Sequence, residues 1–567
     1  MTTTAPSAKS AEQAAQPTFA DLFTPKLITV LREGYGLAGF RADALAGLTV
    51  AIVALPLSMA IAIGAGVSPE RGLYTAIVGG FFISLLGGSR FQIGGPAAAF
   101  IGLVAMTVQR HGFDGLVLAT LMAGVMLLVI GFLRLGTYVK YIPYPVTVGF
   151  TAGIAVIILI TQVRDLFGLT LAHEPAETLP KIKALWQALG TISPITVALS
   201  VASIAAILLV RHLRPNWPAL LIAVVAATII AALLGLQVET IGSRFGAIPA
   251  GLPAPALPAF SLEKARVVFP DAMAIALLGA IESLLSAVVA DGMSGRRHRS
   301  NSELVAQGVG NIATAIFGGV PATGTIARTA TNIRAGARGP VAGMLHAIYL
   351  LIFVLVAMPL VAYVPLAALA GVLVVVAWGM ADRAEFLLLL RSSVADALVL
   401  LGTFVLTIFV DLLTGIGFGV VLGTFLFMHR MAESIEVEGG PKLIADDVSD
   451  SAAADATQSE RALPDDVMVY RISGAFFFGA TARVNLILDR VAKPPRIFVL
   501  DFSDVPFMDI TAAAALERFV ERLHKAGTKV YLAGVRPHVR DVFKLPGLRS
   551  PAIHYAPNVE AALEAAK

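Results

Sequence analysis

The chain has 567 residues, of which 57% are hydrophobic and only 14% are charged. Because soluble proteins carry roughly 25% charged residues, this composition indicates a polytopic membrane protein in a lipid bilayer and excludes a series of soluble domains. The formal net charge of +4 gives no indication of nucleic-acid binding, and the absence of cysteine excludes disulfides and thiolate metal sites.

The N-terminal part of the chain divides into a polar segment and a long apolar region. Residues 1–44 are rich in alanine and lack the charged start and short apolar core of a secretory signal, so they are predicted to form a cytoplasmic segment. A transmembrane transport domain is predicted over residues 45–432, because a spanning helix needs about 20 mainly apolar residues. Charged residues, proline and glycine divide it into two predicted sets of seven spans: 45–64, 72–88, 95–108, 115–134, 145–163, 191–210 and 217–236, then 271–290, 303–318, 324–334, 339–362, 366–381, 394–412 and 414–430.

Basic residues are more frequent in every second loop, which predicts that the N-terminus lies inside. The loop that carries Arg296, Arg297 and Arg299 is one of these predicted cytoplasmic loops. With fourteen spans, both termini are expected in the cytoplasm and the protein in the inner cell membrane.

Two predicted spans are short and begin with glycine and proline. Span three begins at Gly94-Gly95-Pro96, and span ten begins at 321–325, Pro-Ala-Thr-Gly-Thr. Each follows residues suited to an extended stretch, Phe91–Ile93 in the first case and Phe317–Val320 in the second. Short interrupted segments at matching positions of two halves indicate the binding site of an inverted-repeat transporter. The alternative is that these glycines and prolines only tune helix packing.

A helix that starts at mid-membrane directs free N–H groups and the positive end of its dipole into the site, which favours an anion. Arg328 adds a cation about one turn into the second short helix, where an intramembrane charge is usually functional. Alternatively, Arg328 pairs with a carboxylate and only holds helices together. The candidate substrate-binding residues are Gly95, Pro96, Ala97 and Ala98, then Thr323, Gly324, Thr325, Ile326, Ala327 and Arg328, with Ser58 of span one as a further polar lining group.

Glu282 lies near the centre of the predicted span 271–290. A carboxylate at that depth is costly unless it is paired, protonated or exposed to a water-filled cavity, so Glu282 is a candidate ion-coupling residue that carries a proton. Ser286 lies one turn further on the same helical face, and the two side chains could instead ligate sodium through oxygen. The alternative is a fixed Glu282–Arg328 ion pair without a role in transport. No other metal site is expected.

After the membrane domain the composition changes. Residues 433–465 are acidic and rich in Ala, Ser and Asp, which predicts a solvated linker. Strands and helices then alternate over residues 466–567, which predicts a small α/β domain. Its predicted strands are Val467–Ser473, Arg496–Phe502 and Lys529–Ala533, and its predicted helices are Thr511–Ala526 and Asn558–Ala566.

Several separated motifs make the chain resemble the SulP family of sulfate-permease-like anion transporters, which end in a STAS domain. They are Gly47-Leu48-Thr49-Val50-Ala51 with Leu55-Pro56, Gly72-Leu73-Tyr74, Gly95-Pro96, Asp291-Gly292-Met293-Ser294-Gly295 and the segment Thr323–Thr329. The resemblance implies an all-α membrane domain of fourteen helices in two inverted repeats, divided into core and gate domains, and a small cytoplasmic α/β STAS domain. It also implies a homodimer, and a substrate that lies between spans three and ten and moves by an elevator-type mechanism.

The resemblance also bears on the substrate. The sequence around Ala280–Leu285 and Ser89-Arg90-Phe91 most resembles that of bacterial members that take up C4-dicarboxylates with protons. A sodium-coupled bicarbonate branch, or sulfate transport on the same fold, is the alternative. Leu57 stands where many members carry glutamine, and Ala327 where animal members carry serine, which makes the anion harder to name.

Thr511 follows the predicted strand Arg496–Phe502, at a position where soluble relatives of the STAS domain are phosphorylated. An ordinary helix cap at Thr511 is the favoured alternative, and the domain is expected to support dimerisation or to bind a cytosolic regulator.

No HExxH motif, phosphate-binding loop or nucleophile elbow occurs, so no enzyme, catalytic residue or cofactor is expected. The competing functions are an uncoupled anion channel or exchanger and a STAS-based membrane signalling scaffold.

Overall fold

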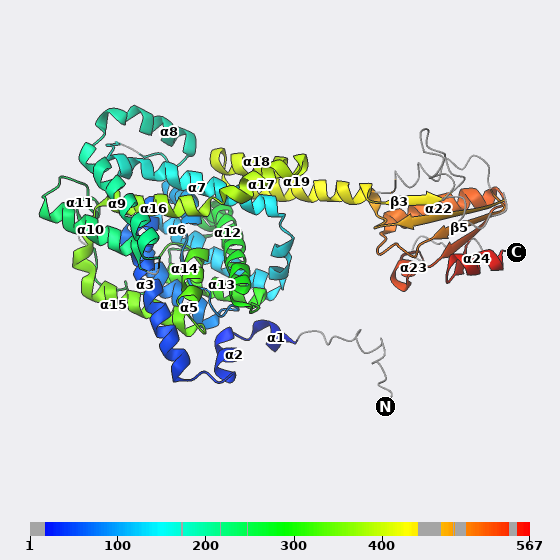
Figure 1. Ribbon diagram of the computed structural model, residues 1–567, viewed down its shortest axis with the longest axis horizontal. Coiled ribbons are helices and arrows are strands. Elements are labelled where there is room, and N and C mark those ends of the chain that lie inside the picture. Colours follow the sequence, from blue (N-terminus) through cyan, green and yellow to red (C-terminus); the bar gives the residue numbers. More distant parts are fainter. Residues whose placement is uncertain are drawn as a thin grey trace. The chain divides into compact units, whose positions relative to one another are not determined.

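The computed structural model describes residues 18–171, 174–215, 217–246, 248–439, 466–479, 481, 495–543 and 553–566 (Figure 1). Most of the predicted linker 433–465 and the first 17 residues of the predicted segment 1–44 lie outside the described residues. The chain divides into two compact units, Met1–Val420 and Val421–Lys567.

The first half of the membrane domain begins with two short helices and ends before residue 262. Its helices and strand are α1 Phe19–Phe23, α2 Lys26–Arg32, α3 Leu37–Gly64, α4 Pro69–Tyr74, the π-helical turn η2 Thr75–Gly79, α5 Gly80–Leu86, β1 Gly94–Pro96, the 3-10 turn η3 Ala98–Phe100, α6 Ile101–Phe132, η4 Leu135–Tyr141, α7 Tyr144–Phe167, α8 Thr178–Gln187, η5 Leu189–Thr191, α9 Pro194–Leu213, α10 Ala219–Leu233 and α11 Ile241–Phe245.

The second half repeats the interruption of a helix by a short strand. It comprises α12 Leu262–Ser294, α13 Ser300–Ile316, β2 Ala322–Gly324, α14 Ile326–Arg334, α15 Val341–Val361, α16 Leu366–Met380, α17 Arg383–Ser392, α18 Val394–Phe409 and α19 Leu412–Glu433.

Among the described residues, eight helices are long and apolar enough to cross a membrane, and α10 and α18 are shorter apolar helices. The eight are α3, the stretch Ala98–Phe132, α7, α9, α12, α15, the stretch Leu366–Ser392 and α19. The stretch Ala98–Phe132 contains two predicted spans, which meet at a kink where Gly112 has φ 69°. The structure thus contains long membrane-spanning helices, as expected from the sequence.

Besides α10 and α18, three further predicted spans are occupied by helices that are short or carry polar residues. Residues 72–88 form α4, η2 and α5; residues 303–318 lie largely in α13; and 324–334 lie largely in α14, which has only 9 residues. α13 and α14 carry buried polar residues such as Asn311 and Arg328, which lower their apolar character. The count of fourteen spans therefore stays a prediction.

The helices of the membrane domain pack in two groups. α6 packs against α12 and α13, and α3 packs against α15, whereas α7 packs against α16, α18 and α9. α6 and α13 cross at two glycines: a Cβ at Gly124 would lie 2.8 Å from the Gly308 carbonyl oxygen, and a Cβ at Gly308 would lie 2.7 Å from that of Gly124. Small residues at this crossing allow the close backbone approach that membrane helices use for packing.

The C-terminal unit contains a five-stranded sheet in the order β3-β4-β5-β6-β7. The strands are β3 Glu436–Gly439, β4 Val467–Ser473, β5 Ile497–Asp501, β6 Lys529–Ala533 and β7 His554–Ala556, and the helices are α22 Ile510–Lys525, α23 Pro537–Phe543 and α24 Val559–Ala565. The three strands and two helices expected from the sequence are confirmed to within one residue at each end. The edge strand β3, which pairs with β4, lies inside the segment 433–465 that the sequence predicts as linker. The sequence of β3, Glu-Val-Glu-Gly, lacks the apolar run that indicates a strand. An edge strand can do without such a run because it tolerates charged residues.

Candidate functional site

The two short strands of the membrane domain pair with each other. β1 and β2 are antiparallel, with Gly94 opposite Gly324, Gly95 opposite Thr323 and Pro96 opposite Ala322. β1 precedes the helical turn at Ala98, and β2 precedes α14. The pairing brings together the starts of two helices that lie more than two hundred residues apart in the sequence.

The strands correct one detail of the sequence analysis. Gly94–Pro96 and Ala322–Gly324, which the sequence predicts as the first residues of the short helices, are extended. The helical turns begin a few residues later, at Ala98 and at Ile326. Pro96 lacks an N–H group, and glycine disfavours helix, so both residues suit a short strand better than a helix interior.

β2 and the residue that leads into it are held by side chains that the sequence analysis missed. Asn311 of α13 donates from Nδ2 to the Ala322 carbonyl at 2.8 Å and accepts from the Ala322 N–H at 2.9 Å. Thr75 of η2 accepts from the Val320 N–H at 2.8 Å and donates to its carbonyl at 2.9 Å. These two side chains replace a neighbouring strand by satisfying the backbone groups at the edge of β2. The signal available in the sequence was a buried polar residue within an apolar segment.

The segment before β1 is held by α14. Thr329 accepts a hydrogen bond from the Ile93 N–H at 3.1 Å, and the Ile93 carbonyl accepts from the Thr325 N–H at 3.1 Å. Asn332 donates to the Phe91 carbonyl at 2.9 Å. The first turns of α14 and the approach to β1 therefore form one hydrogen-bonded structure.

Arg328 is only 1% exposed and lies beside β1. Its Nη2 donates to Ser58 Oγ and to the Pro96 carbonyl, both at 3.1 Å, while Nε and Nη1 are buried without a hydrogen-bond partner. A Cβ at Gly95 would collide with Nη1, so the guanidinium packs directly on the backbone of β1. Among the described residues no carboxylate lies within ion-pair distance of Arg328, which excludes the Glu282–Arg328 pair in this conformation.

Glu282 lies on α12 between two contacts that join this helix to the site. The Gly279 carbonyl, about one turn earlier, accepts from Thr323 Oγ1 at 3.0 Å, and Ser286, one turn later, donates to Thr329 Oγ1 at 3.2 Å. Glu282 itself is 7% exposed and makes no hydrogen bond or ion pair with any described residue. Glu282 therefore lies on the part of α12 that contacts β2 and α14.

The remaining predicted residues occupy two environments. Ala97 and Ala98 are buried at the start of the turn that leads into α6, at 5% and 8% exposure. Ile326 and Ala327 are exposed in the first turn of α14. The first two side chains of α14 are thus exposed, although the side chain of Arg328, the next residue, is buried.

Two further polar side chains near β1 escaped the sequence analysis. Both amide atoms of Gln92 are buried without a partner, and a Cβ at Gly324 would collide with this amide. His346 of α15 is fully buried with both ring nitrogens unpartnered, and its Cε1 lies 4.0 Å from the position of a Cβ at Gly80. Gln92 belongs to the stretch Phe91–Ile93 that the sequence predicts as extended, and His346 lies in a predicted apolar span, but no motif singles out either side chain.

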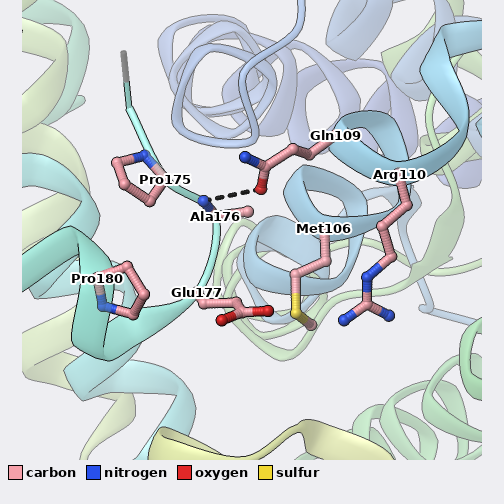
Figure 2. Close-up of a pocket in the computed structure, with 7 residues that line it drawn as sticks. All are labelled: Met106, Gln109, Arg110, Pro175, Ala176, Glu177 and Pro180. Atoms are coloured by element: carbon pink, nitrogen blue, oxygen red, sulfur yellow. Dashed lines mark hydrogen bonds between the residues drawn. The ribbon is translucent and has the colours of Figure 1, made fainter.

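A pocket of about 330 Å³ lies away from these residues, beyond the other end of the first part of α6. Figure 2 shows its lining, which comprises Met106, Gln109, Arg110, Pro175, Ala176, Glu177 and Pro180. None of the predicted site residues lines it.

In the C-terminal unit the structure corrects the alternative proposed for Thr511. The N-cap of α22 is Asp509, whose Oδ1 accepts from the Ala512 N–H at 2.8 Å, and Thr511 is exposed in the first turn. Asp501, at the end of β5, is 2% exposed and accepts hydrogen bonds from Ser503 and Arg471. Burial raises the pKa of Asp501, but these hydrogen bonds and the Arg471 charge outweigh it and hold the pKa below its usual value.

Comparison with known proteins identifies both parts of the chain. The profile of the sulfate permease family matches residues 40–403, and that of the STAS domain matches residues 458–562. The putative sulfate transporter YvdB of Bacillus subtilis is 39% identical over 518 residues, which cover 91% of this chain and 95% of YvdB. The bicarbonate transporter BicA of Synechocystis is 32% identical over 516 residues, which cover 87% of this chain and 88% of BicA.

A solved structure supports the same architecture. The overall structure of SLC26A9 superposes with a TM-score of 0.82 and covers 99% of this chain and 94% of that one. Its sequence is 19% identical, so the likeness concerns the fold.

Proposed function

The chain belongs to the sulfate permease family of anion transporters, and from this premise we propose that it is a secondary active transporter whose anion binds between the starts of α6 and α14. The protein is a multi-pass membrane protein with a C-terminal STAS domain. Membership of this family gives no reason to expect an enzyme.

The observation that carries the proposal is the buried, unpaired cation at Arg328. Removing a charge from water costs several kcal/mol unless a partner offsets it. Ser58 and Pro96 supply neutral acceptors to Nη2 only, and Nε and Nη1 keep unused N–H groups. A bound anion beside the open first turn of α14 would offset the charge of Arg328 and interact with the positive end of the α14 dipole.

Glu282 is the proposed coupling residue. It lies between the contacts of Gly279 and Ser286 with β2 and α14, and no described cation neutralises it. A proton on Glu282 would remove its repulsion for the anion, which links anion binding to proton binding. Sodium held by Glu282 and Ser286 is the alternative, since carboxylate and hydroxyl oxygens are suitable ligands for a hard cation.

The charges at the site favour a monoanion. With a proton or a sodium ion on Glu282, Arg328 leaves one net positive charge, which a monoanion such as bicarbonate neutralises. A dianion such as sulfate or a C4-dicarboxylate would leave a net negative charge in a poorly hydrated site. The proton-coupled C4-dicarboxylate uptake that the motifs favour is kept as the second candidate, although the relatives described above are named for sulfate and bicarbonate.

The proposed transport cycle uses the two helix groups. The group with α3, α6 and α12–α15 carries the site and would move as the core of an elevator against the group with α7, α9, α16 and α18. An inner-membrane location, cytoplasmic termini, a homodimer and a cytosolic regulator at the STAS domain complete the proposal.

Uptake of labelled bicarbonate, sulfate and succinate into proteoliposomes, under imposed proton or sodium gradients, tests this function. Gradient-driven bicarbonate uptake is expected. Proton-driven succinate uptake would instead support the second candidate. Channel-like currents in a planar bilayer, or no flux of any of these anions, would contradict secondary transport and favour a channel or a signalling scaffold.

A further inference from the structure

The connection between α7 and α8 is anchored to its own helix group by a partly buried ion cluster. Glu174 accepts from Arg164 of α7 at 3.1 Å and from Lys181 of α8 at 3.0 Å. The Lys181 side chain is only 5% exposed. Residues 174–181, called the strap below, are therefore held firmly to α7 and α8.

The strap is also attached to α6, which belongs to the other helix group. The Ala176 N–H donates to Gln109 Oε1 at 3.0 Å, as Figure 2 shows. Pro175 has no N–H to offer, so Ala176 supplies the first donor of the strap after this proline. This hydrogen bond thus crosses from the group of α7 to the group of α6.

The position of Gln109 along α6 connects the strap to the candidate site. The helical part between Ala98 and Gln109 is uninterrupted and spans about 16 Å, at 1.5 Å a residue. Its first residue lies at the site, and the kink at Gly112 follows three residues after Gln109. A displacement of the site relative to α7 must therefore stretch or break the contact between Gln109 and Ala176.

The pocket of about 330 Å³ lies between the same two elements. Met106 and Arg110 of α6 form one side, and Pro175, Glu177 and Pro180 of the strap form the other (Figure 2). Because this space is not filled by side chains, α6 can shift toward the strap without displacing a packed core. The hydrogen bond at Gln109 is then a specific constraint on this movement.

We propose that the strap is a conformational latch: it holds the far end of the first part of α6 in the present conformation, and it must release Gln109 during transport. The proposal rests on the proposed function, because it assumes that the two helix groups move against each other.

The absence of cysteine makes a direct test possible. In the double variant Gln109→Cys with Ala176→Cys, a short reversible thiol crosslinker should form a bond in high yield, and the single variants should form none. Crosslinked protein in proteoliposomes should lose uptake at least about tenfold, and a reductant should restore it, because the latch cannot open. Unchanged uptake after complete crosslinking would overturn the latch.

Two further measurements separate failure of the latch from failure of the proposed function. Anion binding to the crosslinked protein in detergent should persist, because the site itself is unaltered; loss of binding would overturn the latch as a purely conformational device. The variant Gln109→Leu has a side chain of similar size that accepts no hydrogen bond. In this variant, with Met106→Cys and Ala176→Cys added, the yield of the crosslink between the two cysteines should change when anion is added. Insensitivity of this crosslink to an anion that the same variant still binds would also overturn the latch.

Discussion

Arg328 Nη2 donates to Ser58 Oγ at 3.1 Å, and this hydrogen bond joins α14 of the second half to α3 of the first. Ser58 Oγ at the same time donates to the Ala54 carbonyl at 2.7 Å, so its hydroxyl proton is engaged and its lone pairs face the guanidinium. The hydroxyl thereby orients Arg328 without neutralising it. The result is a fixed cation beside β1 whose charge remains available to an anion.

Gly95 should be intolerant of any side chain. In Gly95→Ala, the added Cβ would collide with Arg328 Nη1, so the guanidinium must leave its position or the β1–β2 pairing must shift. Anion affinity should fall at least about tenfold, a loss of about 1.4 kcal/mol. Tracer binding to purified protein checks this, with Gly292→Ala as the matched control, since a Cβ at Gly292 meets nothing within 4 Å. Equal affinities for the two variants would contradict the packing of Arg328 on Gly95.

Asn311 should be essential for the stability of the paired strands β1 and β2. In Asn311→Leu, the Ala322 N–H and carbonyl lose the partners that they have at 2.9 and 2.8 Å in a fully buried position. Leaving two buried backbone groups unsatisfied should lower the free energy of unfolding by about 2–4 kcal/mol. The measurement is thermal unfolding in detergent; Asn311→Asp, which retains one acceptor, should be intermediate. Wild-type stability of Asn311→Leu would show that Ala322 finds other partners.

Only part of this site could be predicted from the sequence. The interrupted segments near Gly94 and Ala322, the buried cation at Arg328 and the carboxylate at Glu282 were all recognisable, because glycine, proline and charge stand out in an apolar chain. The pairing of Gly95 with Thr323 was not, since strand register depends on contacts between segments that are remote in sequence.

The supporting residues were harder still to predict. Asn311 binds the backbone of Ala322 in β2 and Thr75 binds the backbone of Val320 before it, and nothing in their local sequence identifies these partners. In the C-terminal unit, short apolar segments predicted β4, β5 and β6 well, but the charged edge strand β3 was interpreted as linker. Asp509 rather than Thr511 caps α22, because the residue that begins the helix depends on the preceding loop.

Glu282→Gln should separate binding from coupling. The amide keeps the size of the side chain but cannot take up a proton, so gradient-driven accumulation should be abolished while anion binding is retained within about threefold. Accumulation ratios in proteoliposomes with and without a proton gradient provide the measurement. Ser286→Ala is the companion variant: if sodium is the coupling ion, it should weaken sodium dependence, and if the proton is, accumulation should persist. Wild-type accumulation in Glu282→Gln would remove the coupling role.

Glu174 should make the strap sensitive to acid. Burial raises the pKa of Glu174, but the charges and hydrogen bonds of Lys181 and Arg164 outweigh it and lower the pKa below its ordinary value. A carboxyl whose pKa is lower in the folded state stabilises that state above its unfolded pKa, and this stabilisation is lost as the pH falls through the folded value. The protection factors of residues 174–181, which correct hydrogen exchange for its intrinsic pH dependence, should therefore be high at neutral pH and fall in acid. Glu174→Gln should show low protection factors at all these pH values; pH-independent protection factors in the wild type would contradict the prediction.

The binding of labelled bicarbonate to purified Arg328→Gln, compared with wild type and with the control Arg334→Gln, tests the central claim most directly. Arg334 lies on the same helix but is exposed in its last turn, so its loss should leave the affinity unchanged. Removal of the buried cation should weaken binding at least about a hundredfold, because a charge-assisted contact of about 3 kcal/mol is lost. Wild-type affinity in a folded Arg328→Gln protein would contradict an anion site between the starts of α6 and α14.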